Sequence, residues 1–333
     1  MTKPRPQVAV IVVGYNSRRW LYDALGSVLA SDGVGDQFDL QVYYVDNDSQ
    51  DGSVGLVRSE FPDVSIFDAQ RNLGFSAGNN LAASEALAVG ADYLFLVNPD
   101  TRTPSKLIRG LVEFMERWPQ YGIVGPMQWA YPSPGASPAP EANEWSVAAL
   151  TAGEAHPLAI NRPSLPPHAP PASERARGTL EHSYVQGAAL FARAAMVHQV
   201  GMLDTTFHSF YEEVEWCRRA RMAGWRVALL QELGIFHCGG AAGGTYRRRQ
   251  MMRNKFVFLF TDPSLSVTDV LAIGAGWLRA DLRGHGVGGT SSIPVALVDL
   301  LVSVAWLVAR IPAIVRMHHG YRRLRKSAEH AAA

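Results

Sequence analysis

The stretch Tyr93-Leu-Phe-Leu-Val97, followed directly by Asn98-Pro99-Asp100, decides the fold. A short apolar run of this kind predicts a buried β-strand. Asp100 then lies at the carboxyl end of the strand, where open α/β sheets bind their ligands. A carboxylate on a rigid element at such an edge suits a hard divalent cation. Asn-Pro-Asp is also ordinary turn chemistry, so the tripeptide alone leaves both interpretations open.

Strands and helices alternate on both sides of this segment. Apolar runs predict strands, and apolar residues at three- and four-residue spacing predict helices. The expected strands are 8–15, 40–45, 64–67, 93–97 and 123–128, and the expected helices are 18–30, 53–60, 77–89 and 104–118. This alternation predicts an α/β protein with a mostly parallel central sheet and right-handed crossovers.

The second part of the chain is less regular. Residues 131–180 hold ten of the twenty prolines, which predicts a surface loop or a partly disordered insertion. After this segment we expect an ordered stretch, a helix, two short strands and a helical C-terminal extension. Their expected ranges are 184–192, 213–223, 226–230, 235–237 and 247–333, the last interrupted at the glycine-rich 283–289.

Composition excludes several classes of protein. A net charge of +1 argues against a dedicated nucleic-acid-binding protein. Cys217 and Cys238 are too few and too far apart for a disulfide framework or a zinc site, which suits a reducing cytoplasm. The N-terminus enters the first strand without the apolar segment of a signal peptide.

One apolar segment raises the question of membrane contact. Residues 293–315 are strongly apolar, but Asp299 interrupts them and Pro294 and Pro312 flank them. Residues 296–309 therefore fit a buried or interfacial helix better than a spanning one. The basic residues behind them favour docking on an anionic leaflet, while a core helix with a solvated tail is the alternative.

Polar residues follow the first two strands and should lie side by side on one rim of the sheet. Tyr15 and Asn16 end the first strand, and Asp46 ends the second. As an acceptor-only group, Asp46 suits a nucleobase or ribose. Asp51-Gly52-Ser53 also fits a turn with a helix N-cap. Glycine-rich dinucleotide and P-loop motifs are absent from the sequence.

The segment Arg71-Asn-Leu-Gly-Phe-Ser-Ala-Gly-Asn-Asn80 follows the third strand and opens a helix. Gly74 and Gly78 permit close backbone approach, and Arg71 offers a cation. Because helix N-terminal amides favour anions, a nucleotide diphosphate suits this position. An ordinary strand-to-helix loop is the alternative.

A further group of residues lies in the second part of the chain. Gly187 belongs to the stretch 186–193, and Glu212 and Glu213 stand at the start of a helix. A glutamate beside an aromatic wall suits a general base for an acceptor hydroxyl, although charge at a helix start is the alternative. His237 ends a short strand, and a lone histidine is more often a satisfied polar residue than a metal ligand.

Together these stretches resemble the family 2 glycosyltransferases, inverting enzymes with the GT-A fold. The resemblance runs from Val8 to about Phe260, without the proline-rich insertion. Within the family, the chain looks most like the bacterial rhamnosyltransferases of cell-wall and O-antigen synthesis. The ordered set that carries it is Val10–Asn16, Asp46–Ser53, Arg71–Asn79, Leu96–Asp100 and Tyr211–Arg219.

The resemblance implies a role for each position. Glu213 falls where the family shows its catalytic base, with Glu212 in reserve, although both aspartates of the family pattern are glutamates here. Asp100 stands where the metal-binding D-x-D motif ends, and His237 matches a downstream histidine that approaches the metal. The positions implied for the nucleotide-sugar are Tyr15, Asn16, Asp46, Arg71, Gly74, Asn79, Asn98, Gly187 and Arg253.

The implied activity is metal-assisted transfer of a sugar, with Mg²⁺ or Mn²⁺ at the diphosphate. The expected donor is dTDP-rhamnose and the expected acceptor is lipid-linked or a polysaccharide of the cell envelope. A galactofuranosyl or other UDP-sugar transferase and a non-catalytic nucleotide-sugar-binding subunit are the alternatives. We expect a cytoplasmic protein, with peripheral contact to the inner face of the plasma membrane and homo-oligomerisation as further expectations.

This resemblance also divides the chain. Residues 1–130 form the expected nucleotide-sugar-binding half and 131–180 the insertion. Residues 181–262 form the expected acceptor-binding and catalytic half. Residues 263–333 form a helical extension associated with the membrane.

Overall fold

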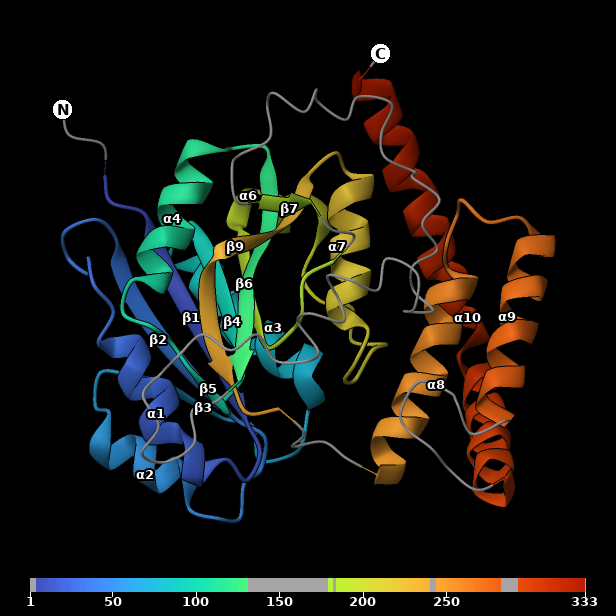
Figure 1. Ribbon diagram of the computed structural model, residues 1–333, viewed down its shortest axis with the longest axis horizontal. Helices are drawn as coiled ribbons and strands as arrows, with labels where there is room; N and C mark the ends of the chain where they lie inside the picture. Colours follow the sequence, from blue (N-terminus) through green and yellow to red (C-terminus); the bar gives the residue numbers. More distant parts are fainter. Residues whose placement is uncertain (1–3, 131–178, 182–183, 240–243, 283–292, 333) are drawn as a thin grey trace.

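The computed structural model describes residues 4–130, 179–181, 184–239, 244–282 and 293–332. Figure 1 shows an α/β part built on a central sheet and, beside it, the C-terminal helices α8, α9 and α10. Most of the expected insertion at 131–180, and all of the glycine-rich 283–289, lie outside the described residues.

Among the described residues, one sheet of nine strands forms the centre of the α/β part. The strands are β1 Gln7–Gly14, β2 Asp39–Asp46, β3 Ser65–Asp68, β4 Tyr93–Val97, β5 Thr101–Arg102, β6 Tyr121–Ala130, β7 Thr179–Glu181, β8 Ala189–Arg193 and β9 Arg226–His237. Their order is β3-β2-β1-β4-β8-β6-β9-β5, with β7 paired to β9. The first four strands in this order, β3, β2, β1 and β4, are parallel to one another, and so are β6 and β9. In contrast, β8, β5 and β7 run antiparallel to the strands with which they pair.

Helices cover both faces of the sheet. They are α1 Arg18–Leu29, α2 Ser53–Glu60, α3 Gly74–Ala88, α4 Leu107–Arg117, α6 Ala194–Val200, α7 Glu212–Met222, α8 Gly244–Phe260, α9 Val267–Leu282 and α10 Ile293–Ala332. Because strand side chains alternate, Val8, Val10 and Val12 pack with α1 and α4, whereas Ala9 and Ile11 pack with α3, α6 and α7. The expected α/β class, mostly parallel sheet and helical extension are confirmed.

Two expectations about the sheet were wrong. The first is the direction of the sheet between β4 and β6, the strand predicted over 123–128, where β8 runs antiparallel to both although crossovers of parallel strands were expected. The strands expected at 226–230 and 235–237 form one strand, β9, whose pairing moves from Pro126↔Leu230 to Met127↔Gly234. The bulge requires a glycine, since a Cβ at Gly234 would lie 2.1 Å from the ring of Trp129.

Helix α10 packs on α7 and α8 through a third apolar cluster that includes Ile314, Met317 and Tyr321. Asp299, which interrupts the apolar run, is 2% exposed and faces α8, where Arg248 and Arg249 donate to it. The segment Leu297–Ser327 is long and apolar enough to cross a membrane, by length and composition alone.

Candidate active site

Asp100 and His237 meet at one edge of the sheet, because β5 pairs with the end of β9 and sets Thr101 opposite His237. Asp100 Oδ1 lies 3.4 Å from His237 Nε2. On the other side of the ring, Nδ1 donates to Gln128 Oε1 at 3.0 Å, since an amide oxygen only accepts. The other ring nitrogen, Nε2, therefore faces the Asp100 carboxylate.

The environment keeps Asp100 ionised. Burial by itself raises the pKa of this carboxyl group, but His237 and the backbone N–H groups of Asp100 and Gly239 outweigh burial and lower it. Asn98-Pro99-Asp100 also forms a turn, in which the Thr101 hydroxyl donates to the Asn98 carbonyl at 2.7 Å. The turn and the strand-end carboxylate are therefore both present.

The rim beside β1 and β2 is held together by its own side chains. Asp46 is 1% exposed, and its two oxygens accept from Tyr44 Oη at 2.9 Å and from the Ser49 amide at 2.8 Å. Asn16 accepts from the Gln50 amide, and Tyr15 is 55% exposed. Asp46 and Asn16 therefore shape the loops, and Tyr15 and Asn16 are the members of this set that reach solvent.

The start of α3 differs from the expectation of an open anion site. The Phe75 amide donates to the His208 carbonyl at 2.7 Å, and the Gly74 amide donates to Asn72 Oδ1 at 2.9 Å. Gly74 has φ +78°, and a Cβ there would lie 2.5 Å from the His208 carbonyl. Gly74 thus permits close packing against His208, while Arg71 is exposed just before it.

A strained turn carries the carboxylates at the start of α7. Phe210 and Tyr211, neither of them glycine, have φ of 68° and 75°. Two successive left-handed residues are costly and persist only where their surroundings hold them. Here the Asn254 side chain of α8 donates to the carbonyls of Ser209 and Phe210 at 2.8 and 2.7 Å.

Glu212 and Glu213 follow this turn without the usual partners of buried acids. Oε2 of each is buried and has no hydrogen-bond partner within the described part of the chain. Burial raises the pKa of Glu213 to about 7, against the opposing backbone amides of the first turn. Burial and then the charge of Glu213 raise the pKa of Glu212 well above its ordinary value. Gly187 packs on Glu213, with a Cβ position 3.6 Å away.

Glu215, one turn further, is satisfied in full. It is 0% exposed, it accepts two hydrogen bonds from Arg219 at 2.6 and 2.8 Å, and it accepts a third from the Tyr321 hydroxyl of α10. The glutamates of α7 therefore divide into two kinds. Glu215 is a satisfied structural acid, and Glu212 and Glu213 at the start of the helix each have an oxygen without a partner among the described residues.

Two residues expected to bind the nucleotide-sugar, Arg253 and Asn79, are engaged within or between helices. The Arg253 guanidinium stacks 5.4 Å from the ring of Trp306, between α8 and α10. Asn79 is 1% exposed, its amide donates to the Phe75 carbonyl, and its Oδ1 has no hydrogen-bond partner among the described residues. Arg253 lies away from the rim because α8 presents it to α10.

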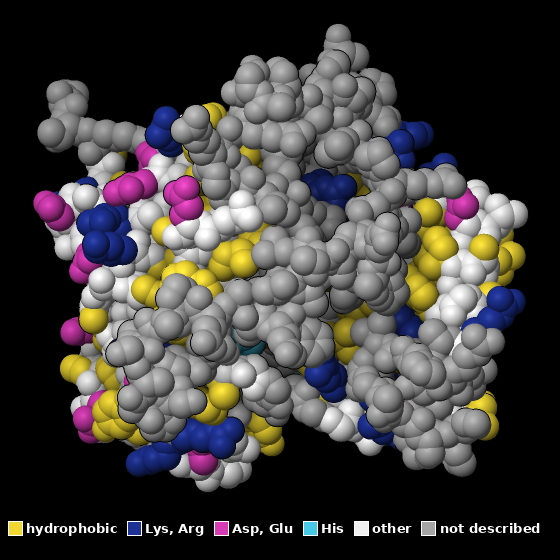
Figure 2. Space-filling view, viewed as in Figure 1, with side chains coloured by type: hydrophobic (Ala, Val, Ile, Leu, Met, Phe, Trp, Pro, Cys, Tyr) yellow, Lys and Arg dark blue, Asp and Glu magenta, His cyan; other side chains and the backbone are white. Residues whose placement is uncertain are grey.

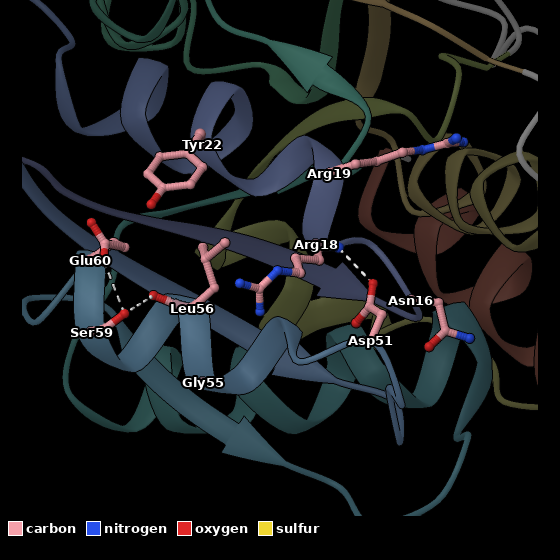
Figure 3. A pocket seen from close by; sticks show the side chains of 9 residues that line it. All are labelled: Asn16, Arg18, Arg19, Tyr22, Asp51, Gly55, Leu56, Ser59 and Glu60. Carbon is pink, nitrogen blue, oxygen red and sulfur yellow. Dashed lines mark hydrogen bonds between the residues drawn. The ribbon is translucent and has the colours of Figure 1, made fainter.

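A surface pocket of about 780 Å³ lies between α1 and α2 (Figure 3). Arg18, which lines it, donates to Asp51 and to the Gly52 carbonyl. Of the residues expected to bind the donor or metal, only Asn16 lines this pocket. The Arg18 guanidinium is already engaged by the Gly52 carbonyl. This pocket therefore does not provide the expected diphosphate site.

A profile of the family described as "Glycosyl transferase family 2" matches residues 9–195, more than half of the chain. The chain belongs to this family. The family-wide match covers the rim, Asp100 and Gly187, while the acids of α7 lie beyond it.

Curated relatives of this family 2 glycosyltransferase act on different substrates. An N-acetylglucosaminyl-diphospho-decaprenol L-rhamnosyltransferase of Mycobacterium tuberculosis is 24% identical over 77% of this chain and 82% of its own. The low-salt glycan biosynthesis hexosyltransferase Agl10 of Haloferax volcanii is 25% identical over 53% and 52%.

Solved structures confirm the GT-A fold. The mannosyltransferase PcManGT of Pyrobaculum calidifontis, in complex with GDP-Man and Mn²⁺, has TM-score 0.55 at 16% identity, covering 98% of this chain and 87% of that one. S. aureus TarS 1–349 has TM-score 0.53 at 14% identity, with coverage of 98% and 92%.

Sequence patterns missed several residues that organise the site. Gln128 orients His237, and it stands at the carboxyl end of a predicted strand, which was a usable signal. Asn254 directly follows Arg253 in the sequence, but its contact with the turn before Glu212 depends on tertiary structure. Nothing in the local sequence connects Tyr321 with Glu215.

Proposed function

We propose that this protein is an inverting glycosyltransferase in which Glu213 is the general base. The observation that carries the proposal is the Glu213 carboxyl group, whose Oε2 is buried without a partner among the described residues and whose pKa is raised to about 7. A base whose pKa lies near the working pH combines the correct protonation state with sufficient basicity. The metal role of Asp100 and His237 and the base role of Glu213 both remain proposals.

Asp100 and His237 suit a divalent cation. The two ligand atoms, Oδ1 and Nε2, lie 3.4 Å apart, and Gln128 orients the ring from behind. Among the described residues no group of three or more His, Cys, Asp or Glu side chains could hold a metal. The protein would thus supply two ligands and leave positions for the donor diphosphate. A nitrogen ligand beside a carboxylate favours Mn²⁺ over Mg²⁺. When bound, the ion would neutralise the leaving nucleotide diphosphate.

In the proposed mechanism, Glu213 accepts the proton of the acceptor hydroxyl as that oxygen attacks the anomeric carbon. The bond from that carbon to the diphosphate oxygen breaks in the same displacement, which inverts the configuration. Burial and then the charge of Glu213 raise the pKa of Glu212, which disfavours its charged form beside Glu213. Tyr184 contributes to the wall of this site, because the charge of Glu213 adds to burial in raising the pKa of Tyr184 to about 12.

The proposed donor is dTDP-rhamnose and the proposed acceptor is a saccharide on a lipid diphosphate of the cell envelope. The rhamnosyltransferase relative supports this choice through its name and through its coverage of both chains. The cytoplasmic location, with peripheral contact to the plasma membrane, is proposed from the same relative and from the apolar face of α10. Homo-oligomerisation stays a prediction.

A donor screen tests this function. The full chain is incubated with dTDP-rhamnose, UDP-galactofuranose or GDP-mannose, a lipid-linked N-acetylglucosamine acceptor and Mn²⁺, and nucleotide release is measured. We expect acceptor-dependent release of dTDP, a smaller rate with Mg²⁺, and loss of activity with a chelator. Asp100→Ala should lower kcat/KM by about 10³-fold, because it removes an ionised metal ligand. Donor binding without transfer to any acceptor would support the binding-subunit alternative instead.

A further inference from the structure

The face of α8 that meets α10 carries more positive than negative charge. Arg248 and Arg249 donate from Nε to the buried Asp299 at 3.1 and 2.7 Å. Arg253, one turn along from Arg249, has an Nε without a hydrogen-bond partner among the described residues. Its pKa is lowered by burial and then by Arg249. Three guanidinium groups therefore share one carboxylate, which leaves this face suited to an anion.

Helix α8 also contacts the turn that precedes Glu212 and Glu213. The Tyr246 hydroxyl lies 2.9 Å from His208 Nδ1 and donates to Ser209 Oγ at 3.3 Å. Tyr246, Arg249 and Arg253 follow helical spacing of three and four residues, which sets them on one face of α8. This arginine face, defined as Tyr246, Arg249 and Arg253, begins beside the turn that leads to Glu213 and ends at α10.

An apolar stripe runs along the face of α10 that points away from α8. The residues have helical spacing and are 45–70% exposed: Leu297, Leu301, Val304, Val308, Ile311 and Val315. Figure 2 shows hydrophobic side chains on the side of the molecule where α9 and α10 stand. The opposite face of α10 packs on α7 and α8, so α10 is apolar on both faces. A helix with such an exposed apolar face suits contact with hydrocarbon.

We propose that the arginine face binds the diphosphate of a prenyl-diphosphate-linked acceptor, whose hydrocarbon chain stays in a membrane that the apolar stripe contacts. Guanidinium groups bind phosphate through paired, charge-assisted hydrogen bonds. An amphiphile with an anionic head and an apolar tail uses both surfaces, and its sugar then extends towards Glu213. This inference rests on the proposed function and assigns Arg253 to the acceptor instead of the donor.

Calorimetry on the full chain, with geranylgeranyl diphosphate as the probe, tests the proposal. Arg253→Gln should weaken binding about tenfold or more, because a charged hydrogen-bond donor is lost, and Arg253→Lys should recover part of the loss. Arg58→Gln, an exposed arginine of α2, is the matched control and should bind as the wild type does. Binding of dTDP-rhamnose to Arg253→Gln should be unchanged, and its Tm should report that the chain is folded.

Three outcomes would overturn the proposal. In the first, Arg253→Gln binds geranylgeranyl diphosphate as tightly as the wild type. In the second, geranylgeraniol, which lacks the diphosphate, binds as tightly as the diphosphate does. In the third, Arg253→Gln loses affinity for dTDP-rhamnose or for phosphatidylglycerol vesicles, with the probe unaffected. Probe binding that depends on Arg253 without sugar transfer would support this inference and contradict the proposed function, whereas transfer to a soluble acceptor without probe binding would do the reverse.

Discussion

Polar side chains gather in two regions of this protein, the rim around Asp46 and the turn before Glu213. At the rim, the side-chain oxygens of Asp46 and Asn16 accept hydrogen bonds from neighbouring residues and loops. At the turn, the Oε2 atoms of Glu212 and Glu213 are buried without partners among the described residues, after two left-handed residues. Buried polar groups are normally paired, and exceptions require an explanation. The rim oxygens are thus engaged in loop structure, whereas the turn carries acids with an oxygen that is not.

The largest expected effect separates Glu213 from its neighbours. Glu213→Gln removes the proposed base while it keeps the size of the side chain, so kcat should fall about 10³-fold. The thermal midpoint should not fall, because a buried, unpaired acid is replaced by a neutral amide. Transfer kinetics and calorimetric unfolding measure the two quantities. Full turnover in this variant would remove the basis of the proposed mechanism.

Glu215 provides the matched contrast on the same helix. Glu215→Ala leaves the buried Arg219 without its carboxylate, which should cost about 3–5 kcal/mol of unfolding free energy. Urea unfolding measures this loss, with Glu85→Ala on the exposed surface of α3 as the control. If Glu215→Ala were as stable as the control, the division between structural and chemical acids would be wrong.

The pH dependence should follow Glu213. Its pKa is raised to about 7, so below that pH the carboxyl group is protonated and cannot accept a proton. The value of kcat should therefore rise about tenfold per unit below pH 7 and level off above it. Asp100, whose pKa is lowered, is ionised over this range and should add no second step. A flat profile between pH 5 and pH 8 would contradict the assignment.

A smaller effect is expected at the contact that holds the turn. Asn254→Ala removes both donors to the carbonyls of Ser209 and Phe210, which should lower stability by about 1–3 kcal/mol and kcat by roughly tenfold. Equal kinetics for Asn254→Ala and the wild type would show that the turn holds itself.

The smallest effect concerns the rim. Asp51 accepts from the Arg18 amide and from the Ser53 amide and hydroxyl, in the manner of a helix cap. Asp51→Ala should cost about 1 kcal/mol of unfolding free energy, with kcat unchanged. A fall in kcat larger than the loss of folded protein explains would assign the rim a direct part in the reaction.

Much of the α/β part was predictable, because β1, β2 and β4 are apolar runs and α1 and α4 show helical spacing. The pairing of β4 with β8 was not, since nearly a hundred residues separate the two strands and antiparallel insertion leaves no local pattern. The site follows the same division. Asp100, Glu213 and His237 were recognisable from strand ends and a helix start, whereas Gln128 and Asn254 depend on contacts between distant elements.

The sequence by itself determined which residues can carry charge, ligate a metal or accept a proton, because side-chain chemistry and strand periodicity are local. Tertiary structure alone decided which of those groups remain unpaired. It supplied Arg219 and Tyr321 to Glu215, Arg248 and Arg249 to Asp299, and left Glu213 without a partner for Oε2 within the described residues. Burial and pairing are long-range properties. On α7 they distinguish Glu213, the proposed base, from Glu215, the structural acid.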